Sequence, residues 1–339
     1  MSRPFIIPVF LPHHGCPHRC IFCNQTAITS TKQNLLISET LASWINEFLN
    51  YKRRKRHPVQ IAFYGGNFLG LKTDDIKRLL AEATRFVTAG KVDGIRFSTR
   101  PDTIDHRRLD LIEPFPVTTI EVGVQSMDDQ VLAAANRGHT AADTQKALTL
   151  LKERTYEIGL QMMVGLPGDD ETKALATGRR LAAFLPDFVR IYPTVVLANS
   201  ALAERYQNGL YSPWSLGRCV TCVKNLYLLF CSQGIPVVRM GLQLSEDLAK
   251  DASVLAGPYH PAFGHLVHSE IFLDTAMAAI RPAKSNRKAI TLKVHPRSIS
   301  KMRGLNNQNV DILKKEFKIE SLQIVPDHAL AENRLIVSE

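Results

Sequence analysis

The chain alternates short runs of apolar residues with longer segments in which apolar positions recur every three to four residues. The first pattern is typical of buried strands and the second of amphipathic helices, so their regular alternation predicts repeated βα units around a parallel sheet. We expect six strands, at Phe5–Leu11, Val59–Tyr64, Gly94–Thr99, Val117–Gln125, Gly159–Val164 and Phe188–Val195. The pattern therefore predicts an α/β fold, a partial (β/α)6 barrel of the TIM type.

The helical segments complete this layout. Between the strands we expect helices near Glu39–Arg56, Thr73–Ala89, Asp105–Glu113, Asp128–Asn136, Ala142–Glu153 and Asp170–Phe184. After the sixth strand we expect helices near Ser200–Gln207 and Trp214–Gln233, a further strand at Pro236–Leu242, and a Gly/Pro-rich end of the barrel at 257–264.

The last part of the chain has the pattern of a smaller unit. A helix is expected near Leu266–Ile280, followed by an α+β unit from about Arg287 that includes a helix at Val310–Phe317. We therefore predict two domains: residues 1–265, the barrel with its C-terminal extension, and residues 266–339, a small basic α+β module that we call the C-terminal module.

Composition narrows the class of protein. The 339 residues are 45% hydrophobic, with 19 Gly and 18 Pro, which excludes a disordered or collagen-like chain. No run approaches the roughly 18–20 apolar residues of a membrane helix, and Pro12 ends the first apolar run too early for a secretory signal. We expect a cytoplasmic protein. Six cysteines are too few for a disulfide scaffold, so their spacing indicates metal or redox chemistry instead.

Three of these cysteines form a C-x3-C-x2-C motif, Cys16, Cys20 and Cys23, in the loop after the first predicted strand. Their thiolates can each bind one iron of a [4Fe–4S] cube, which leaves the fourth iron open to a substrate or cofactor. The alternative is a zinc knuckle in which a nearby histidine, His13, His14 or His18, is the fourth ligand. The motif predicts a metal centre and leaves both alternatives open.

Glycine-rich or polar segments follow the other predicted strands. They are Tyr64-Gly65-Gly66-Asn67-Phe68, Ser98-Thr99-Arg100-Pro101-Asp102, Gly123-Val124-Gln125-Ser126, Met163-Val164-Gly165-Leu166-Pro167-Gly168 and Ile191-Tyr192-Pro193-Thr194. In a βα barrel these strand ends share one rim, where active sites form. With Phe22 before the last cysteine, the cysteine motif and the Gly-Gly turn resemble the radical S-adenosylmethionine (radical SAM) superfamily. The resemblance implies an enzyme that uses a [4Fe–4S] cluster to cleave S-adenosylmethionine (SAM) reductively to a 5′-deoxyadenosyl radical.

Several rarer strings narrow the resemblance. Ser98–Asp102, Val122–Ser126, Asn136–Thr140, Ile191–Thr194 and Gly209–Pro213 occur in the order found in the radical domain of the Elongator catalytic subunit, a family that acts on the wobble uridine of tRNA. The similarity spans about Phe5 to Pro213. It implies that Phe22 packs beside the cluster, that Gly65, Gly66 and Asn67 hold the methionine end of SAM, and that Ser98, Arg100 and Gln125 reach its carboxylate or ribose. Arg137 is a further candidate for cofactor binding.

The resemblance breaks at two points. The Elongator subunit carries an acetyltransferase domain with an Arg/Gln-x-x-Gly-x-Gly/Ala loop, and this string is absent here. Fewer than a hundred residues follow Leu242, so we do not expect this chain alone to carry out acetyl-CoA-dependent carboxymethylation. Asn67 replaces a Thr of the Elongator pattern, which puts its contact with the cofactor in doubt.

The net charge of +10 is concentrated in one stretch. Residues 281–318 contain eleven Lys or Arg and two acids, a balance of +9, while the rest of the chain has thirty-one basic and thirty acidic residues. This stretch predicts a contact with a phosphate backbone, which implies tRNA or another RNA as a partner; the alternative is a solvated basic surface. A second basic run, Lys52–Arg56, is expected on the opposite face of the barrel from the cofactor and is not assigned to RNA.

Other candidate residues have structural alternatives. Cys219, Cys222 and Cys231 either bind an auxiliary cluster or pack in an apolar helix, and Asp169–Glu171 either bind a metal or cap a helix. His13 and His14 are candidates for shielding the cluster. Tyr259, His260, Lys301 and Arg303 are candidates for contacting a substrate, and Tyr259 and His260 alternatively stabilise a turn.

The sequence as a whole predicts a radical SAM enzyme, with RNA as the favoured substrate. An enzyme of this class needs an electron donor such as flavodoxin or ferredoxin. A small molecule, a porphyrin or a peptide remains an alternative substrate, and a non-catalytic metal-binding protein is the alternative from a different class.

Overall fold

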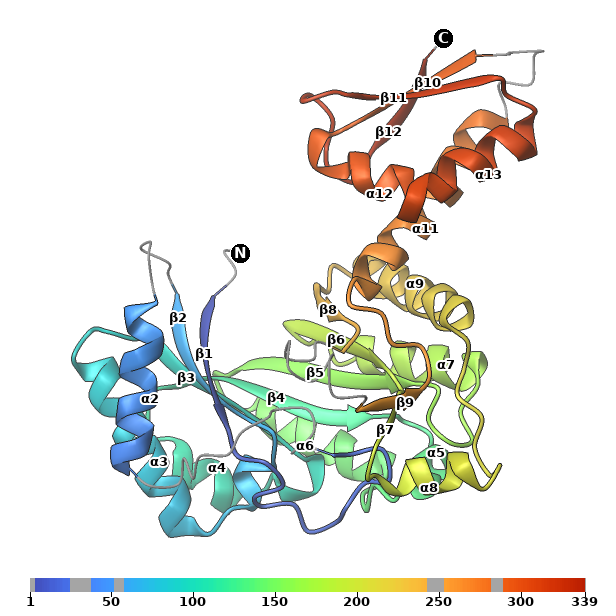
Figure 1. The fold of residues 1–339 in the computed structure, drawn as a ribbon. Coiled ribbons are helices and arrows are strands. Elements are labelled where there is room, and N and C mark those ends of the chain that lie inside the picture. The colour runs from blue at the N-terminus through green and yellow to red at the C-terminus, as the bar shows by residue number, and fades with distance from the viewer. Residues whose placement is uncertain (1–3, 25–37, 52–57, 243–252, 282–288, 339) are drawn as a thin grey trace.

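The fold, seen in a computed structural model, is an open, curled parallel sheet that joins a smaller module through one helix (Figure 1). The structure describes residues 4–24, 38–51, 58–242, 253–281 and 289–338. Among these residues, no helix is both long and apolar enough to cross a membrane.

Seven parallel strands form the main sheet in the order β1-β2-β3-β4-β5-β6-β8. They are β1 Phe5–Phe10, β2 Val59–Tyr64, β3 Gly94–Thr99, β4 Val117–Gln125, β5 Glu157–Val164, β6 Phe188–Pro193 and β8 Val237–Met240. The predicted barrel of the TIM type is confirmed, and the further strand expected at Pro236–Leu242 extends the six βα units by one. Because β1 and β8 do not pair, the sheet is a half-barrel with two open edges.

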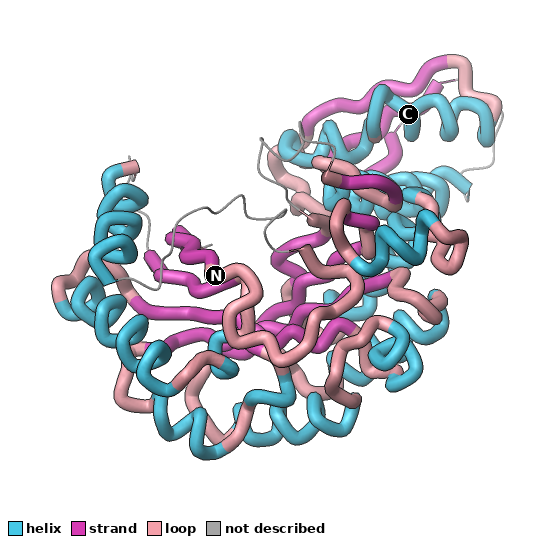
Figure 2. Tube along the Cα trace, turned by 60° about the horizontal axis from the view of Figure 1, so that its bottom comes forward, coloured by secondary structure: helices cyan, strands magenta, loops and turns pink. Residues whose placement is uncertain are grey.

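Helices cover the outer, convex face of this sheet (Figure 2). They are α2 Ser38–Asn50, α3 Thr73–Thr88, α4 His106–Ile112, α6 Ala141–Lys152, α7 Glu171–Ala182 and α9 Leu216–Ser232. Two shorter helices, α5 Asp129–Ala134 and α8 Ala201–Gln207, pack in small clusters beside the cysteine loop, and the 3-10 helices η1 Phe68–Gly70 and η2 Pro101–Thr103 follow β2 and β3. The main apolar core fills the space between helices and sheet and includes Ile61, Leu80 and Phe230, each fully buried. The predicted helix at Glu39–Arg56 ends earlier, at Asn50, and residues 52–57 lie outside the described part of the chain.

Local capping explains where several helices begin. Asp170 accepts a hydrogen bond from the Lys173 backbone N–H at 2.8 Å and caps α7, as expected for the Asp169–Glu171 segment. Thr140 and Asp143 form a reciprocal capping box at the start of α6.

Two short strands were not predicted. The expected strand at Phe188–Val195 ends at Pro193, and β7 Val196–Leu197 then pairs antiparallel with β9 Val254–Ala256. Strands of two or three residues carry too few alternating positions to be recognised in a sequence.

The C-terminal module forms a second core on the end of α11 Phe263–Ile280. Its three-stranded sheet has the order β11-β10-β12, with β10 Ala289–Val294, β11 Ser321–Pro326 and β12 Leu335–Ser338. The helices α12 Ile299–Arg303 and α13 Gln308–Phe317, with 3-10 helices η4 Pro296–Ser298 and η5 Leu305–Asn307, connect β10 to β11. Val267 of α11 packs in the main core and Phe272 in the second, so the predicted division at residue 266 falls inside a helix that both cores share.

Candidate functional site

The three cysteines of the motif lie in the loop between β1 and α2 and line one cavity of about 720 Å³. Cys20 is buried, Cys16 and Cys23 are half-buried, and none of the three is in a disulfide bond. Phe22 lines the same cavity and packs on two small apolar clusters beside the loop. The sequence therefore brings the predicted metal ligands to a single open space on the inner side of the barrel.

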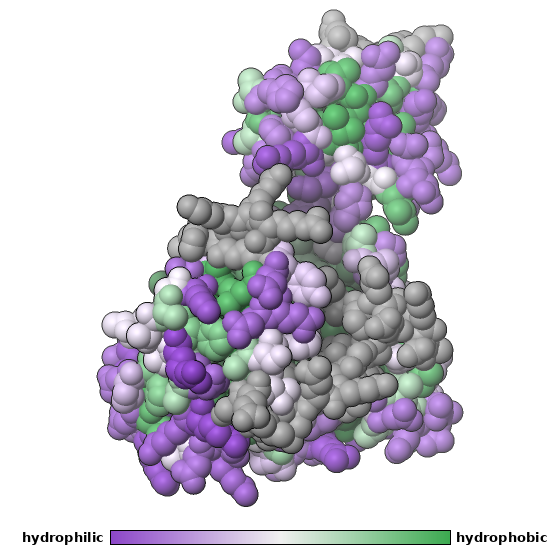
Figure 3. All heavy atoms as spheres, turned by 60° about the vertical axis from the view of Figure 1, so that its left-hand side comes forward, coloured by the Kyte–Doolittle hydropathy of each residue, from purple (hydrophilic) through white to green (hydrophobic). Residues whose placement is uncertain are grey.

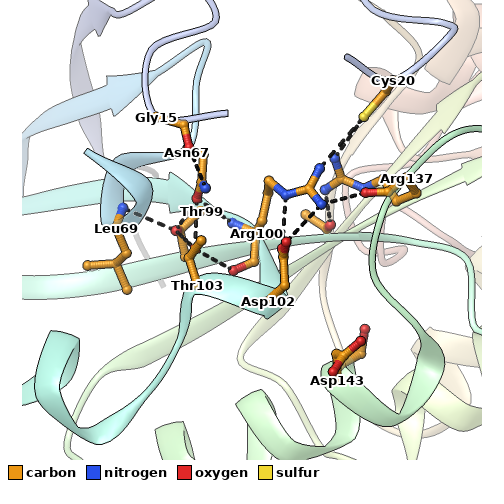
Figure 4. Close-up of polar contacts among 12 residues, drawn as sticks. Gly15, Cys20, Asn67, Leu69, Thr99, Arg100, Asp102, Thr103, Arg137 and Asp143 are labelled. Atoms are coloured by element: carbon orange, nitrogen blue, oxygen red, sulfur yellow. Dashed lines mark hydrogen bonds and ion pairs between the residues drawn. The ribbon is translucent and has the colours of Figure 1, made fainter. Parts of the chain in front are cut away.

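Two arginines face the buried thiol of Cys20 (Figure 4). The Nη1 atom of Arg137 lies 3.1 Å from Cys20 Sγ, and Nη1 of Arg100 lies 3.9 Å from it. Arg137 also donates to the Gly123 carbonyl, and Arg100 pairs with Asp102 at 2.9 Å. Cations beside a thiol stabilise the thiolate, which is the form that binds iron, so the chemistry of this pair fits an iron–sulfur centre.

The strand ends supply the rest of the cavity wall. Gly65 and Gly66 follow β2, Ser98 and Arg100 lie at the end of β3, and Gln125 ends β4. Gln125 has a φ of +72°, and the pairing of β4 with β5 shifts by one residue between Gly123 and Gln125. Such a bulge re-aims a side chain. The structure thus brings all the predicted cofactor residues except one to the cavity wall.

The exception is Asn67, whose side chain does not line the cavity and is fully buried. Its amide Nδ2 donates to the Gly15 carbonyl at 2.9 Å. Its Oδ1 accepts hydrogen bonds from Thr99 Oγ1, Thr103 Oγ1 and the Arg100 backbone N–H, at 2.7–3.0 Å (Figure 4). Asn67 therefore links the cysteine loop to the end of β3, and its contact with the methionine end of a cofactor stays a prediction.

The backbone around the hydrogen bonds of Asn67 is tightly packed. Gly15 has a φ of +72°, and a Cβ at Gly66 would lie 2.4 Å from the His14 carbonyl oxygen and 2.6 Å from that of Leu11. Since real Cβ atoms do not approach backbone oxygens so closely, the Gly-Gly turn is what allows the end of β2 to contact the cysteine loop.

A polar network that was not predicted lies on the inner face of the sheet. Glu121 of β4 is fully buried and accepts from Tyr64 Oη at 2.7 Å and Gln161 Nε2 at 2.9 Å. It pairs with Arg190 at 2.7 Å and with Arg96 at 3.4 Å. Burial alone raises the pKa of Glu121, but the two arginines outweigh it and hold the pKa below its usual value. Alternation along the strands could have indicated which of these side chains point inward, because each occupies an inward position in a strand otherwise rich in apolar residues.

The zinc-knuckle alternative requires four ligands around one ion. Among the residues that the structure describes, no three His, Cys, Asp or Glu side chains are grouped closely enough to hold a metal ion. A four-iron cube makes a different demand, since each cysteine binds a different iron.

Comparison with known proteins decides the family. The model of the Radical SAM superfamily matches residues 10–181, slightly more than half of the chain. The chain belongs to the radical SAM superfamily. A second model, the Radical_SAM C-terminal domain, matches residues 186–272 of this radical SAM protein.

Relatives of this radical SAM protein confirm the resemblance to Elongator. The tRNA uridine(34) acetyltransferase of Dehalococcoides mccartyi (strain CBDB1) is 27% identical over 246 residues, which cover 63% of this chain and 54% of that protein. Elongator complex protein 3 of Dictyostelium discoideum is 24% identical over 267 residues, 66% of this chain and 48% of that protein. The chain spans about half the length of these curated relatives, and the similarity lies in the radical SAM portion.

A solved structure confirms the fold. The archaeal Methanocaldococcus infernus Elp3 with an N-terminal deletion superposes with a TM-score of 0.63 at 20% identity, covering 80% of this chain and 63% of that chain.

The remaining candidates lie away from the cavity. Tyr259 and His260 do not line it, and His260 Nδ1 accepts the backbone N–H of Ala262 within a turn. Lys301 and Arg303 lie in α12 of the C-terminal module. Of the two alternatives for these cysteines, Cys219 and Cys222 are buried in α9 and pack in the main core, whereas Cys231 is exposed and does not.

Proposed function

We propose that this radical SAM protein is an enzyme in which Cys16, Cys20 and Cys23 hold a [4Fe–4S] cluster and the cavity binds SAM. The cluster, when bound and reduced, supplies the electron that cleaves SAM to methionine and a 5′-deoxyadenosyl radical. The observation that carries the proposal is the set of three cysteines on one cavity, none of them in a disulfide bond, with Arg137 Nη1 3.1 Å from Cys20 Sγ.

The residues around the cavity have distinct tasks in this proposal. Burial and the nearby Cys20 raise the pKa of Cys16, and Arg100 and Arg137 oppose that rise. The two arginines therefore favour the thiolates that the cluster needs. Gly65, Gly66, Ser98 and Gln125 line the space beside the cysteines, and we assign them to SAM.

Cluster assembly tests the assignment of the three cysteines. Anaerobic reconstitution of the wild type is expected to give about four iron and four sulfide per chain. Cys20→Ala is expected to lose most of that iron, whereas the matched control Cys231→Ala, at an exposed cysteine, retains it. Zinc bound by the wild type in place of iron, or full iron in Cys20→Ala, would contradict the proposal.

We propose RNA, and tRNA in particular, as the substrate. Two relatives are named for an activity on tRNA uridine or as an Elongator protein. The second support is the basic stretch 281–318, of which Lys284, Arg287 and Lys288 lie outside the described residues. Six of its described basic side chains are exposed: Arg281, Lys293, Arg297, Arg303, Lys315 and Lys318. Figure 3 shows hydrophilic residues over much of the visible face of the C-terminal module.

We extend the proposal to partners and location. A flavodoxin or ferredoxin in the cytoplasm supplies the electron. Acetyl transfer is left out of the proposal because the matched region is the radical SAM portion of the relatives.

Charge reversal in the C-terminal module tests the RNA substrate. The triple variant Arg303→Glu, Lys315→Glu, Lys318→Glu is expected to bind tRNA at least about tenfold more weakly and with a shallower salt dependence, because each lost phosphate contact removes about 0.9 from the slope. The control reverses three exposed lysines on the outer helices and the following turn, Lys77, Lys91 and Lys146. Equal, salt-insensitive binding by the wild type and both variants would contradict the RNA substrate and leave the cluster assignment standing.

A further inference from the structure

A second group of cations lines the cavity, on strands far along the sheet from the cysteine loop. The charged residues that line the cavity are Arg19, Arg100, Arg137, Arg190, Arg239 and Glu121. Arg100 and Arg137 face Cys20, and Arg100 also pairs with Asp102. Arg190 and Arg239 lie on β6 and β8, at the edge of the sheet opposite to β1.

The two arginines are neighbours because of a bulge. Val189 pairs with Val237, but Arg190 pairs with Arg239, so Val238 is an extra residue in β8. In a regular ladder Val238 would lie opposite Arg190 and Arg239 would point to the other face. The bulge therefore turns Arg239 toward the cavity beside Arg190, and bulges next to functional sites commonly re-aim a side chain in this way.

The charge of this pair is not balanced within the described residues. Glu121 is shared between Arg190 and Arg96, and it is also saturated by hydrogen bonds from Tyr64 and Gln161. Arg96 has a second partner in Glu157 at 3.3 Å. No described acidic residue pairs with Arg239, which is exposed. Arg96 and Arg190 are matched by Glu121 and Glu157, so Arg239, which lies outside this network, adds one unmatched positive charge to the cavity wall.

Like charges on directly paired residues of neighbouring strands repel each other, and the strands are only about 4.8 Å apart. An anion that lies between the two side chains relieves this repulsion. Two guanidinium groups offer several N–H donors at fixed angles, and this matches the oxygens of a phosphate better than a carboxylate, which a single arginine binds in full.

We propose that Arg190 and Arg239 form a phosphate-binding subsite of the cavity, separate from the cysteine end, that holds the substrate while the reacting group points toward the cysteines. The phosphate belongs either to a polynucleotide or to a small phosphate ester. This assignment rests on the proposed function in one respect only, namely that the cavity is the active site.

The test uses the reconstituted full chain and inorganic phosphate as the probe. Arg239→Gln is the main variant because Arg239 is exposed and outside the Glu121 network, so the fold does not depend on it. Arg190→Lys, which keeps a charge beside Glu121, is the second variant. The control is Arg179→Gln, which makes the same charge change on the exposed outer face of α7.

Phosphate binding is measured by titration calorimetry, with and without SAM. We expect Arg239→Gln to weaken binding about tenfold, Arg190→Lys to weaken it less, and Arg179→Gln to leave it unchanged. Equal binding by wild type and Arg239→Gln, or displacement of phosphate by SAM, would overturn the subsite.

A second arm identifies the source of the phosphate with a five-nucleotide single-stranded RNA. Weaker RNA binding by Arg239→Gln than by Arg179→Gln assigns the phosphate to a polynucleotide, and equal RNA binding assigns it to a small phosphate ester. Release of 5′-deoxyadenosine is recorded in the same samples. A wild type that binds phosphate but does not cleave SAM would contradict the proposed function alone, so the two failures are distinguishable.

Discussion

Close contacts at single residues decide the shape of the candidate site. Gly66 meets the backbone oxygens of Leu11 and His14, and Gly123 leaves room for Arg137, whose Nη2 would lie 3.0 Å from a Cβ at that position. At both positions the lack of a side chain matters for space, and not only for backbone flexibility. Each allows a close approach that places a cysteine ligand or its cationic neighbour.

Gly66→Ala is expected to displace the cysteine loop, because the new Cβ would meet backbone oxygens that cannot rotate away. We predict that the variant assembles less than about half of the wild-type iron on reconstitution. Gly217→Ala is the control, since a Cβ there meets nothing within 4 Å and the residue lies in α9. Wild-type iron content in Gly66→Ala would show that the turn tolerates a side chain.

A second residue, His139, links the site to acid stability. Burial, with added repulsion from Arg137 and Arg100, lowers the pKa of His139 from 6.5 to about 3. The unfolded chain therefore takes up a proton below about pH 6.5 that the folded chain refuses. The free energy of unfolding is therefore unaffected by His139 above about pH 6.5. Below that pH it falls by about 1.4 kcal/mol for each pH unit.

Urea unfolding at pH 7.5 and 5.5 measures this effect. Wild type is expected to lose about 1.4 kcal/mol more than His139→Phe over that interval. His106→Phe, at an exposed histidine in α4, is expected to behave as wild type. Equal pH dependence in wild type and His139→Phe would remove His139 as the cause.

The site residues differ in how far the sequence predicts them. The cysteines are close in sequence and share a spacing that limits their chemistry, so a local motif identifies them. The hydrogen bonds of Asn67 could not be predicted, because its partners Gly15, Thr99 and Thr103 belong to the cysteine loop and to the end of β3, which are far apart in the sequence. Arg239 was not predicted as a cavity residue. The bulge in β8 changes which side chains point into the cavity, and a bulge cannot be recognised from the alternation of apolar and polar residues.

At the scale of elements, the strands followed directly from the sequence. β2, β3 and β4 have the predicted bounds, and nearly all of their residues are buried, as expected for strands covered on both faces. The pair β7 and β9 was missed because its partners are two and three residues long and lie more than fifty residues apart. The helix α9 was also predicted, and it holds two cysteines outside the metal-binding motif, Cys219 and Cys222, in the main core.

Cys219 and Cys222 lie one turn apart on α9 and are 0% and 2% exposed. Burial raises the pKa of each to about 12, so both remain neutral thiols at physiological pH. We predict that the double variant Cys219→Ala, Cys222→Ala retains the wild-type iron content while its free energy of unfolding falls by about 1–3 kcal/mol, because two buried sulfur atoms are removed. Loss of iron from this variant would identify them as ligands.

At the scale of the whole molecule, α11 determines how the two parts are joined. Val267 packs in the barrel core, and Phe272, Ala276 and Ile280 pack in the core of the C-terminal module. On α9, Lys224 pairs with Glu270 and Asp274 of α11 at 2.8 and 2.5 Å. Removal of the module would expose the apolar end of α11, so surface charge variants test RNA binding more cleanly than truncation.

The open half-barrel brings the strand ends, the cysteine loop and the two arginine pairs to one cavity. Arginines line both ends of the cavity, Arg100 and Arg137 beside Cys20 and Arg190 and Arg239 on β6 and β8. This arrangement supports the central claim that the chain binds a cluster and SAM in order to generate a radical beside a bound substrate.

Release of 5′-deoxyadenosine tests that claim most directly. Reconstituted wild type, incubated anaerobically with dithionite and SAM, is expected to release 5′-deoxyadenosine and methionine in equal amounts, and Cys20→Ala is expected to release neither. Wild type that carries a full complement of iron and sulfide yet forms no 5′-deoxyadenosine would contradict the account.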